Sequence, residues 1–137
     1  MQESTRSMLR DTINMTEEDM NKLSPGLQKL LDAVPEVTRY KVIAEVTDVQ
    51  YCFAGLKVGD KLVFGPPPNI LNVEESTCAL CLDAIAPLAE HVRMMMDRMA
   101  EGLDPNDAIY IYGECFDRGI EHGGLGKVWF KLSAQKM

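Results

Sequence analysis

Apolar and polar residues alternate with a period of two between Arg39 and Gln50, and this alternation predicts a β-strand. The two sides of the strand carry Tyr40, Val42, Ala44 and Val46 on one face and Lys41, Ile43, Glu45 and Thr47 on the other. Weaker strand patterns follow at 57–64, 109–112 and 128–132. Because Pro66, Pro67 and Pro68 lack the N–H that a strand ladder uses, we expect the second strand to stop before them.

Helical spacing of apolar residues predicts one long helix between Ser76 and Ala100. Its apolar side carries Leu82, Ile85, Leu88, Val92, Met95, Met96 and Met99. Pro87 interrupts the pattern, either as a kink or near the start of a second helix, and Gly102 is placed to end it. We expect the methionine-rich side to fill the core, although thioethers also suit a ligand or partner surface.

The first 38 residues have helical patterns and differ in character from the rest of the chain. Thr16 is placed to cap a short helix that runs to about Leu23. Ser24 and Pro25 are typical of the start of another helix, which we expect Pro35 to end. Two interpretations stay open: residues 1–38 pack on their own domain, or they form a docking arm that binds a larger enzyme subunit or a second copy of the chain.

These patterns together predict the α+β class. The expected architecture is a small four-stranded, mostly antiparallel sheet or partly open barrel, covered by one long helix, with the N-terminal helices added. The expected division is a helical extension or docking arm at 1–38 and a cysteine-containing domain at 39–137.

The net charge limits the kinds of partner that this 137-residue chain can bind. The formal net charge of −7 argues against nucleic acid and anionic membrane surfaces, which require clustered Lys and Arg. No stretch approaches the ~20 apolar residues of a spanning helix, and residues 1–6 lack the apolar centre of a secretory signal. We therefore expect a cytoplasmic protein whose four cysteines are reduced thiols or metal ligands.

The cysteines are the residues with the clearest chemical potential. Cys78 and Cys81 form a C-x-x-C pair at the start of the predicted long helix, where unpaired amides and the helix dipole favour thiolate over thiol. Cys52 and Cys115 lie in loops beside strand ends and could converge on that pair to hold zinc or an iron–sulfur cluster. Inert buried thiols and a redox or nucleophilic thiol remain alternatives.

Residues 113–126 form a long, glycine-rich connection between two predicted strands. Glycines permit unusual backbone angles and close approach, so this loop could wrap a ligand. Its polar side chains would then be Asp117, Arg118, Glu121 and His122. The alternative is a wide hairpin with an irregular turn.

Three blocks of sequence carry a resemblance to a known family. They are 41–46 with Cys52, Gly55 and Val58-Gly59-Asp60, then Cys81 with 84–88, and last 115–117 followed by 126–130. In their order and spacing these blocks resemble a family of small uncharacterised cysteine-containing proteins, with a shared unit of about 90 residues, from mostly anaerobic bacteria and archaea. The resemblance implies no activity.

The resemblance singles out Cys52, Cys81 and Cys115, and Cys78 is an addition to the family pattern. It thereby implies a three-cysteine site that His122, water or a partner residue would complete.

No catalytic motif accompanies these features. We therefore expect a non-catalytic accessory protein, a small subunit of a larger enzyme complex that binds zinc or an iron–sulfur cluster. A stand-alone thiol-dependent enzyme that uses Cys81 or Cys115 is one alternative. A small-molecule-binding module that uses loop 113–126 is another.

Overall fold

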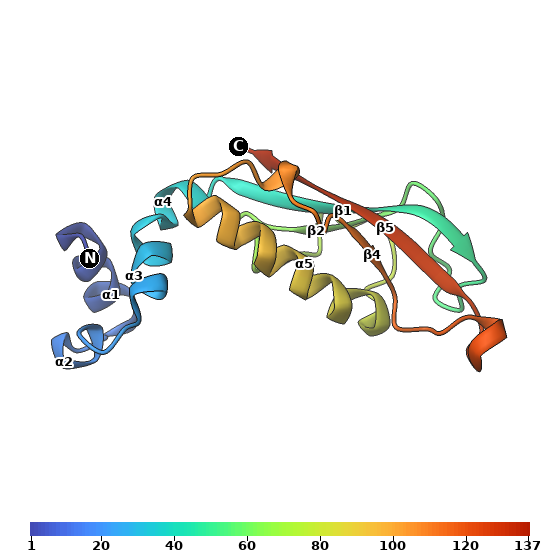
Figure 1. Cartoon of the computed structure of the whole chain (residues 1–137), viewed down its shortest axis with the longest axis horizontal. Helices are drawn as coiled ribbons and strands as arrows, with labels where there is room; N and C mark the ends of the chain where they lie inside the picture. The colour runs from blue at the N-terminus through green and yellow to red at the C-terminus, as the bar shows by residue number, and fades with distance from the viewer.

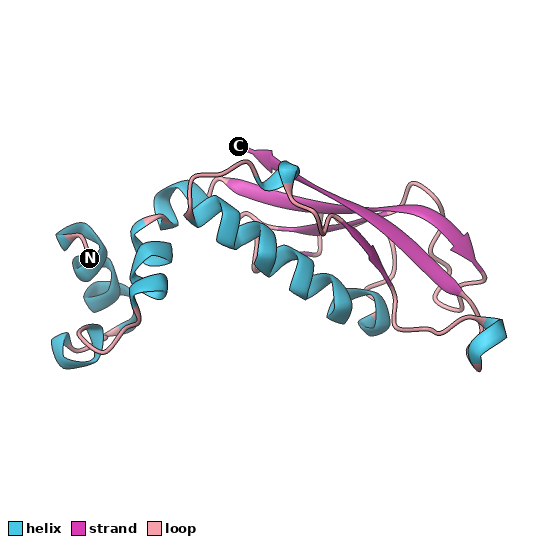
Figure 2. Cartoon of the chain, viewed as in Figure 1, coloured by secondary structure: helices cyan, strands magenta, loops and turns pink.

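The computed structural model describes residues 1–137 as an α+β chain with five α-helices and one open, five-stranded antiparallel sheet (Figures 1 and 2). The helices are α1 (Glu3–Ile13), α2 (Glu17–Met20), α3 (Pro25–Asp32), α4 (Val34–Val37) and α5 (Leu82–Ala100). The strands are β1 (Tyr40–Gln50), β2 (Lys61–Phe64), β3 (Leu71–Asn72), β4 (Tyr112–Glu114) and β5 (Lys127–Lys136). Short 3-10 turns lie at η1 (Pro105–Asp107) and η2 (Ile120–His122). None of these helices has the length and apolar character needed to cross a membrane.

The sheet has the order β3-β2-β1-β5-β4, with the long strand β1 at its centre. The α+β prediction is confirmed, but the predicted four strands are one too few. The additional strand is β3, two residues that pair with Val63 and Phe64 of β2. The predicted stop before Pro66 is also confirmed, because β2 ends at Phe64. The sheet is open and not a barrel, since β3 and β4 are its unpaired edges.

Helix α5 covers one face of the sheet (Figure 2). Between them lies the core, which includes Val42, Ala44, Val46, Leu62, Phe64, Leu88, Val92, Met95, Phe130 and Leu132. The alternation predicted for β1 is therefore confirmed. Met95 and Met99 are buried in the core, as expected for the apolar side of the helix, whereas Met94 is 38% exposed. Pro87 lies inside this single helix.

Helix α5 begins at Leu82, and the predicted start at Ser76 is wrong. Residues 76–78 run beside β2 instead. The Ser76 hydroxyl accepts the Val63 N–H at 3.0 Å, and the Thr77 N–H donates to the Lys61 carbonyl at 2.9 Å. These bonds tie residues 76 and 77 to β2, ahead of the helix.

Strand β4 lies further along the chain than the predicted strand at 109–112. Only Tyr112 of that segment belongs to β4, and Ile109 is 85% exposed. Gly113 explains the register: a Cβ there would lie 3.0 Å from Leu88 Cδ2 and 3.1 Å from His91 Nε2. The strand therefore comes against α5 at the one residue without a side chain.

The N-terminal helices α1, α2 and α3 lie beyond the C-terminal end of α5, away from the sheet (Figure 1). They have a small core of their own around Leu9 and Met20. Lys29 of α3 pairs with Glu101 at the end of α5, at 2.8 Å. The predicted helix over 24–34 is in fact two: α3 ends at Asp32, and Pro35 belongs to the first turn of α4, where its missing N–H costs nothing.

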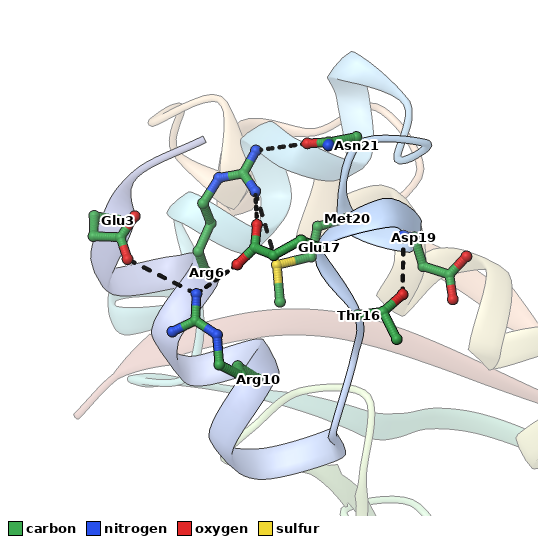
Figure 3. Close-up of polar contacts among 8 residues, drawn as sticks. All are labelled: Glu3, Arg6, Arg10, Thr16, Glu17, Asp19, Met20 and Asn21. Atoms are coloured by element: carbon green, nitrogen blue, oxygen red, sulfur yellow. Dashed lines mark hydrogen bonds and ion pairs between the residues drawn. The ribbon is translucent and has the colours of Figure 1, made fainter.

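Glu17 holds α1 and α2 together (Figure 3). Its carboxylate accepts hydrogen bonds from Arg6, at 2.6 Å, and from Arg10. Arg6 also donates to the Asn21 side chain at 3.0 Å. The Thr16 hydroxyl caps α2 by accepting the Asp19 N–H, as predicted. These contacts give residues 1–23 a defined local structure; whether the segment serves as a docking arm stays a prediction.

Candidate functional site

Three of the four cysteines line one small pocket at the end of the sheet where β1 stops and α5 begins. Cys52 comes from the loop after β1, Cys81 from the residue before α5, and Cys115 from the residue after β4. The pocket has a volume of about 80 Å³. Its other walls are Tyr51, Phe53, Ala54, Leu56, Asp83, Ala84, Asp117, Gly126 and Val128. The structure thus brings three of the four cysteines to one pocket.

Gly126 closes this pocket against the end of β1. A Cβ at this position would overlap the backbone carbonyl oxygens of Gln50 and Tyr51. Tyr51 itself has a φ of 61°, so the chain turns sharply just before Cys52. The glycine thus lets the end of loop 113–126 pack directly on the backbone that places Cys52.

Cys115 is held from both sides by Val128 of β5. The Cys115 N–H donates to the Val128 carbonyl at 3.0 Å, and the Val128 N–H donates to Cys115 Sγ at 3.3 Å. The thiol is also the most enclosed of the four, because Cys115 is only 8% exposed. A thiol fixed by the sheet ladder in this way has a defined position before any ligand arrives.

Cys81 is the N-cap residue of α5, and its side chain makes no capping hydrogen bond. Its carbonyl accepts the Ile85 N–H at 2.9 Å, which begins the helix. Two residues later, the Asp83 carbonyl accepts the Phe116 N–H at 2.9 Å. This bond ties the first turn of α5 to the residue after Cys115, so two walls of the pocket are linked through the backbone.

Cys78 has a different environment from the other three cysteines and does not line the pocket. Its thiol donates to the Lys61 carbonyl at 3.7 Å. Burial, followed by the nearby Asp60 carboxylate and the thiols of Cys52 and Cys81, raises its pKa from 9.0 to about 11. The expected thiolate at Cys78 is therefore wrong for this structure: α5 starts four residues later, too far for its dipole to act.

The thiols are near one another without forming a complete ion site. No three His, Cys, Asp or Glu side chains are placed so as to hold a metal ion. His122 is exposed in η2 and is not among the pocket residues, so the structure does not bring it to the three cysteines. The acidic residues that line the pocket are Asp83 and Asp117. The donor type suits a thiophilic ion, but the thiols would have to turn toward one another to hold it.

Asp117 organises the glycine-rich loop itself. Its carboxylate accepts the N–H groups of Gly119 at 2.9 Å and Leu125 at 3.0 Å. The Gly119 amide first, and then the Gly126 and Leu125 amides, lower the pKa of Asp117 below its ordinary value. A carboxylate used in this way is already satisfied inside its own loop, which favours the wide-hairpin interpretation over a loop that wraps a ligand with Asp117.

Large apolar side chains in the segments that carry the pocket cysteines are exposed to solvent. Phe53, at the pocket wall, is 96% exposed. Exposed neighbours in the same loops and at the start of α5 are Tyr51, Leu80, Leu82 and Phe116. Sequence reasoning missed this rim, although Phe53 in a loop that has no strand or helix pattern was an available signal.

A second, larger hollow of about 510 Å³ lies beside β4 and shares Cys115 with the cysteine pocket. His91 of α5 lines it, half-buried, and its Nδ1 lies 2.8 Å from the Tyr110 carbonyl oxygen. That contact requires a proton on Nδ1, because a carbonyl only accepts. No local sequence motif indicates this contact.

The chain matches no protein-family model, no curated protein and no solved structure. The family resemblance noted in the sequence therefore stays a prediction, and the site is interpreted from its own residues.

Proposed function

We propose that this protein is a non-catalytic, cytoplasmic accessory subunit that binds a thiophilic metal ion through Cys52, Cys81 and Cys115 and docks on a larger enzyme. The observation that carries the proposal is that these three cysteines, from three distant segments, line one pocket. Cysteine thiolates are the preferred ligands of such ions.

The number of cysteines favours a single zinc ion over an iron–sulfur cluster. Iron–sulfur clusters are held by four cysteine thiolates, one more than the pocket offers. Three protein ligands leave the fourth position of tetrahedral zinc for water or for a group of the partner.

The exposed rim supports the docking part of the proposal. Phe53 lies at the pocket wall, and the exposed Leu82 and Phe116 directly follow Cys81 and Cys115 in the chain. Exposed apolar patches with polar surroundings mark protein interaction sites in soluble proteins. The net charge of −7 makes nucleic acid an improbable occupant of that surface.

Elemental analysis of anaerobically purified protein tests the metal site, with single Cys→Ser variants to assign the ligands. We expect about one zinc per chain. Cys52→Ser, Cys81→Ser and Cys115→Ser should each lose most of the metal, while the matched variant Cys78→Ser keeps it. Absence of zinc and iron in wild-type protein refolded with excess metal would overturn the metal site.

Thiol titration separates the metal site from the enzyme alternative. In a metal site, Cys52 and Cys81 should become reactive toward alkylating reagents only after a chelator removes the ion. A cysteine that reacts rapidly at neutral pH with no metal bound would favour a thiol-dependent enzyme instead. The docking part has its own test: Phe53→Ser should abolish capture of the partner from native lysate without changing the zinc content.

A further inference from the structure

A separate apolar pocket of about 260 Å³ lies between α5 and the loop that joins β2 to β3. Pro68 of that loop lines it, together with apolar side chains of β2, β3 and α5 that include Phe64, Leu71, Ile85, Val92 and Met96. The two polar residues of the lining are Asn69 of the loop and Arg93 of α5, and Arg93 is the only charged residue among them. A mostly apolar cavity with a few polar groups is the usual composition of a small-molecule site.

Loop 65–70 gives this pocket a fixed wall. The Gly65 N–H donates to the Ile70 carbonyl at 2.7 Å, and the Ile70 N–H donates to the Pro67 carbonyl at 3.0 Å. The Asn72 side-chain amide donates to the Gly65 carbonyl at 3.0 Å, which joins the loop to β3. A wall that is already fixed in the free protein lowers the entropic cost of binding a ligand.

The side chains of Arg93 and Asn69 have no partner within the chain. Arg98 of the same helix donates to the Asp104 carbonyl at 2.9 Å, whereas Arg93 makes neither an ion pair nor a hydrogen bond. The Asn69 side-chain amide makes no hydrogen bond either. The pocket therefore offers N–H donors and one positive charge that no other residue uses. A guanidinium presents its donors in a fork that matches the two oxygens of a carboxylate.

The adjoining hollow has a different charge balance. It measures about 490 Å³ between α3 and α5, and it shares Asn69 and Arg93 with the pocket. Lys29, Asp97 and Glu101 also line it, and Lys29 pairs with Glu101 at 2.8 Å. The acidic residues of the hollow therefore offset its basic ones, whereas the positive charge in the 260 Å³ pocket is not offset by any residue of its lining. An anionic group is favoured in the pocket and not in the hollow.

We propose that the 260 Å³ pocket binds a small molecule with an apolar body and a single carboxylate, such as a medium-chain fatty acid. The apolar body lies against Ile85, Val92 and Met96, and the carboxylate accepts N–H groups from Arg93 and Asn69. The apolar walls supply affinity by removing the body from water, and the guanidinium selects an anion over a neutral or cationic ligand. The net charge of −7 repels anions at long range, so a carboxylate requires such a local cation.

Isothermal titration of the full-length protein with octanoate tests the site. 1-Octanol and octylamine are matched probes that have the same chain and a neutral or a positive head group. We expect octanoate to bind, octanol to bind about tenfold more weakly, and octylamine more weakly still. Arg93→Gln should lower the affinity for octanoate about tenfold and leave that for octanol unchanged. Arg118→Gln is the matched control, because it removes the same charge from an exposed residue that lines neither the pocket nor the hollow.

Amide chemical shifts locate the ligand. Octanoate should move the resonances of Asn69 and Ala89, which line the pocket, and leave that of Phe53 at the cysteine pocket in place. Ala89→Trp should block binding without unfolding the protein, because Ala89 is an exposed wall residue of α5. Absence of binding at about 10 mM octanoate would overturn the proposal. Equal affinity for octanol, undiminished binding to folded Ala89→Trp, or equal weakening by Arg93→Gln and Arg118→Gln would overturn it as well.

Discussion

The Val128 N–H donates a hydrogen bond to the Sγ atom of Cys115 at 3.3 Å, while the Cys115 N–H donates to the Val128 carbonyl at 3.0 Å. In a regular β4–β5 ladder the Val128 N–H would bond to a backbone carbonyl of β4. Here it bonds to the Cys115 sulfur instead. The arrangement fixes one thiol of the cysteine pocket as an extension of the sheet, whereas Cys52 and Cys81 lie on turns.

Alkylation rates should reflect this difference. In metal-free native protein at pH 8, we expect iodoacetamide to modify Cys115 at least about tenfold more slowly than Cys52 or Cys81, because attack requires local opening of the sheet. Peptide mass spectrometry over a time course measures the rates. In urea the same rates should converge. Fastest modification at Cys115 in the native protein would contradict the assignment of a fixed, enclosed thiol.

Cys78 should make the stability of the metal-free protein fall with rising pH. Its pKa is raised from 9.0 to about 11, so between these values the folded chain keeps a proton that the unfolded chain releases. The stabilisation is complete below about pH 9 and is lost as pH rises through 11. Urea unfolding at several pH values measures this decline. Cys78→Ser should flatten it, and an unchanged slope in that variant would refute the explanation.

Asp117→Ala should loosen loop 113–126 without unfolding the sheet. The carboxylate accepts the Gly119 and Leu125 N–H groups, so both amides should exchange faster in the variant while that of Val128 stays protected. The pKa of Asp117 is lowered in the folded state. In the wild type, protonation of this carboxylate as pH falls through that pKa should therefore loosen the loop in the same way. Glu121→Ala, an exposed change in the same loop, is the control and should alter neither amide.

Gly126→Ala should destabilise the protein by about 1–3 kcal/mol, because the added Cβ overlaps the carbonyl oxygens of Gln50 and Tyr51. Zinc binding should weaken as well if the pocket holds metal, since Cys52 follows that backbone. Gly26→Ala in α3 meets nothing within 4 Å and should stabilise the protein by about 0.5–1 kcal/mol. Equal effects of the two changes on urea unfolding would show that the close approach at Gly126 is unimportant.

Met95→Ala and Met94→Ala compare adjacent methionines of α5, one buried and one exposed. Met95 is fully buried, so its truncation should cost about 2–5 kcal/mol of unfolding free energy. Met94 is 38% exposed, and its truncation should change stability by less than about 0.5 kcal/mol. Thermal and urea unfolding measure both values. A large loss from Met94→Ala alone would indicate that this side chain is covered in solution, by a partner or a second copy.

Local patterns in the sequence determined the main elements of the fold. The alternation over 39–50 gave β1 and its buried face, and the helical spacing around Leu88, Val92 and Met95 gave the body of α5 and the side it buries. Gly102 follows the end of that helix with a φ of 73°, as its position predicted. These features depend on the period of a strand or helix and on residue-specific backbone preferences, which neighbouring residues already contain.

Tertiary contacts decided the remaining features, including most of the site. Bonds from Ser76 and Thr77 to β2 delayed the start of α5, and the close approach of Gly113 to α5 set the register of β4. The convergence of Cys52, Cys81 and Cys115 on one pocket, with Cys78 near two of these thiols but outside the pocket lining, depends on how distant segments pack at one end of the sheet. Such contacts form between residues far apart in the chain, so no periodicity or short motif contains them; the sequence supplied the thiols, and packing selected which three share a pocket.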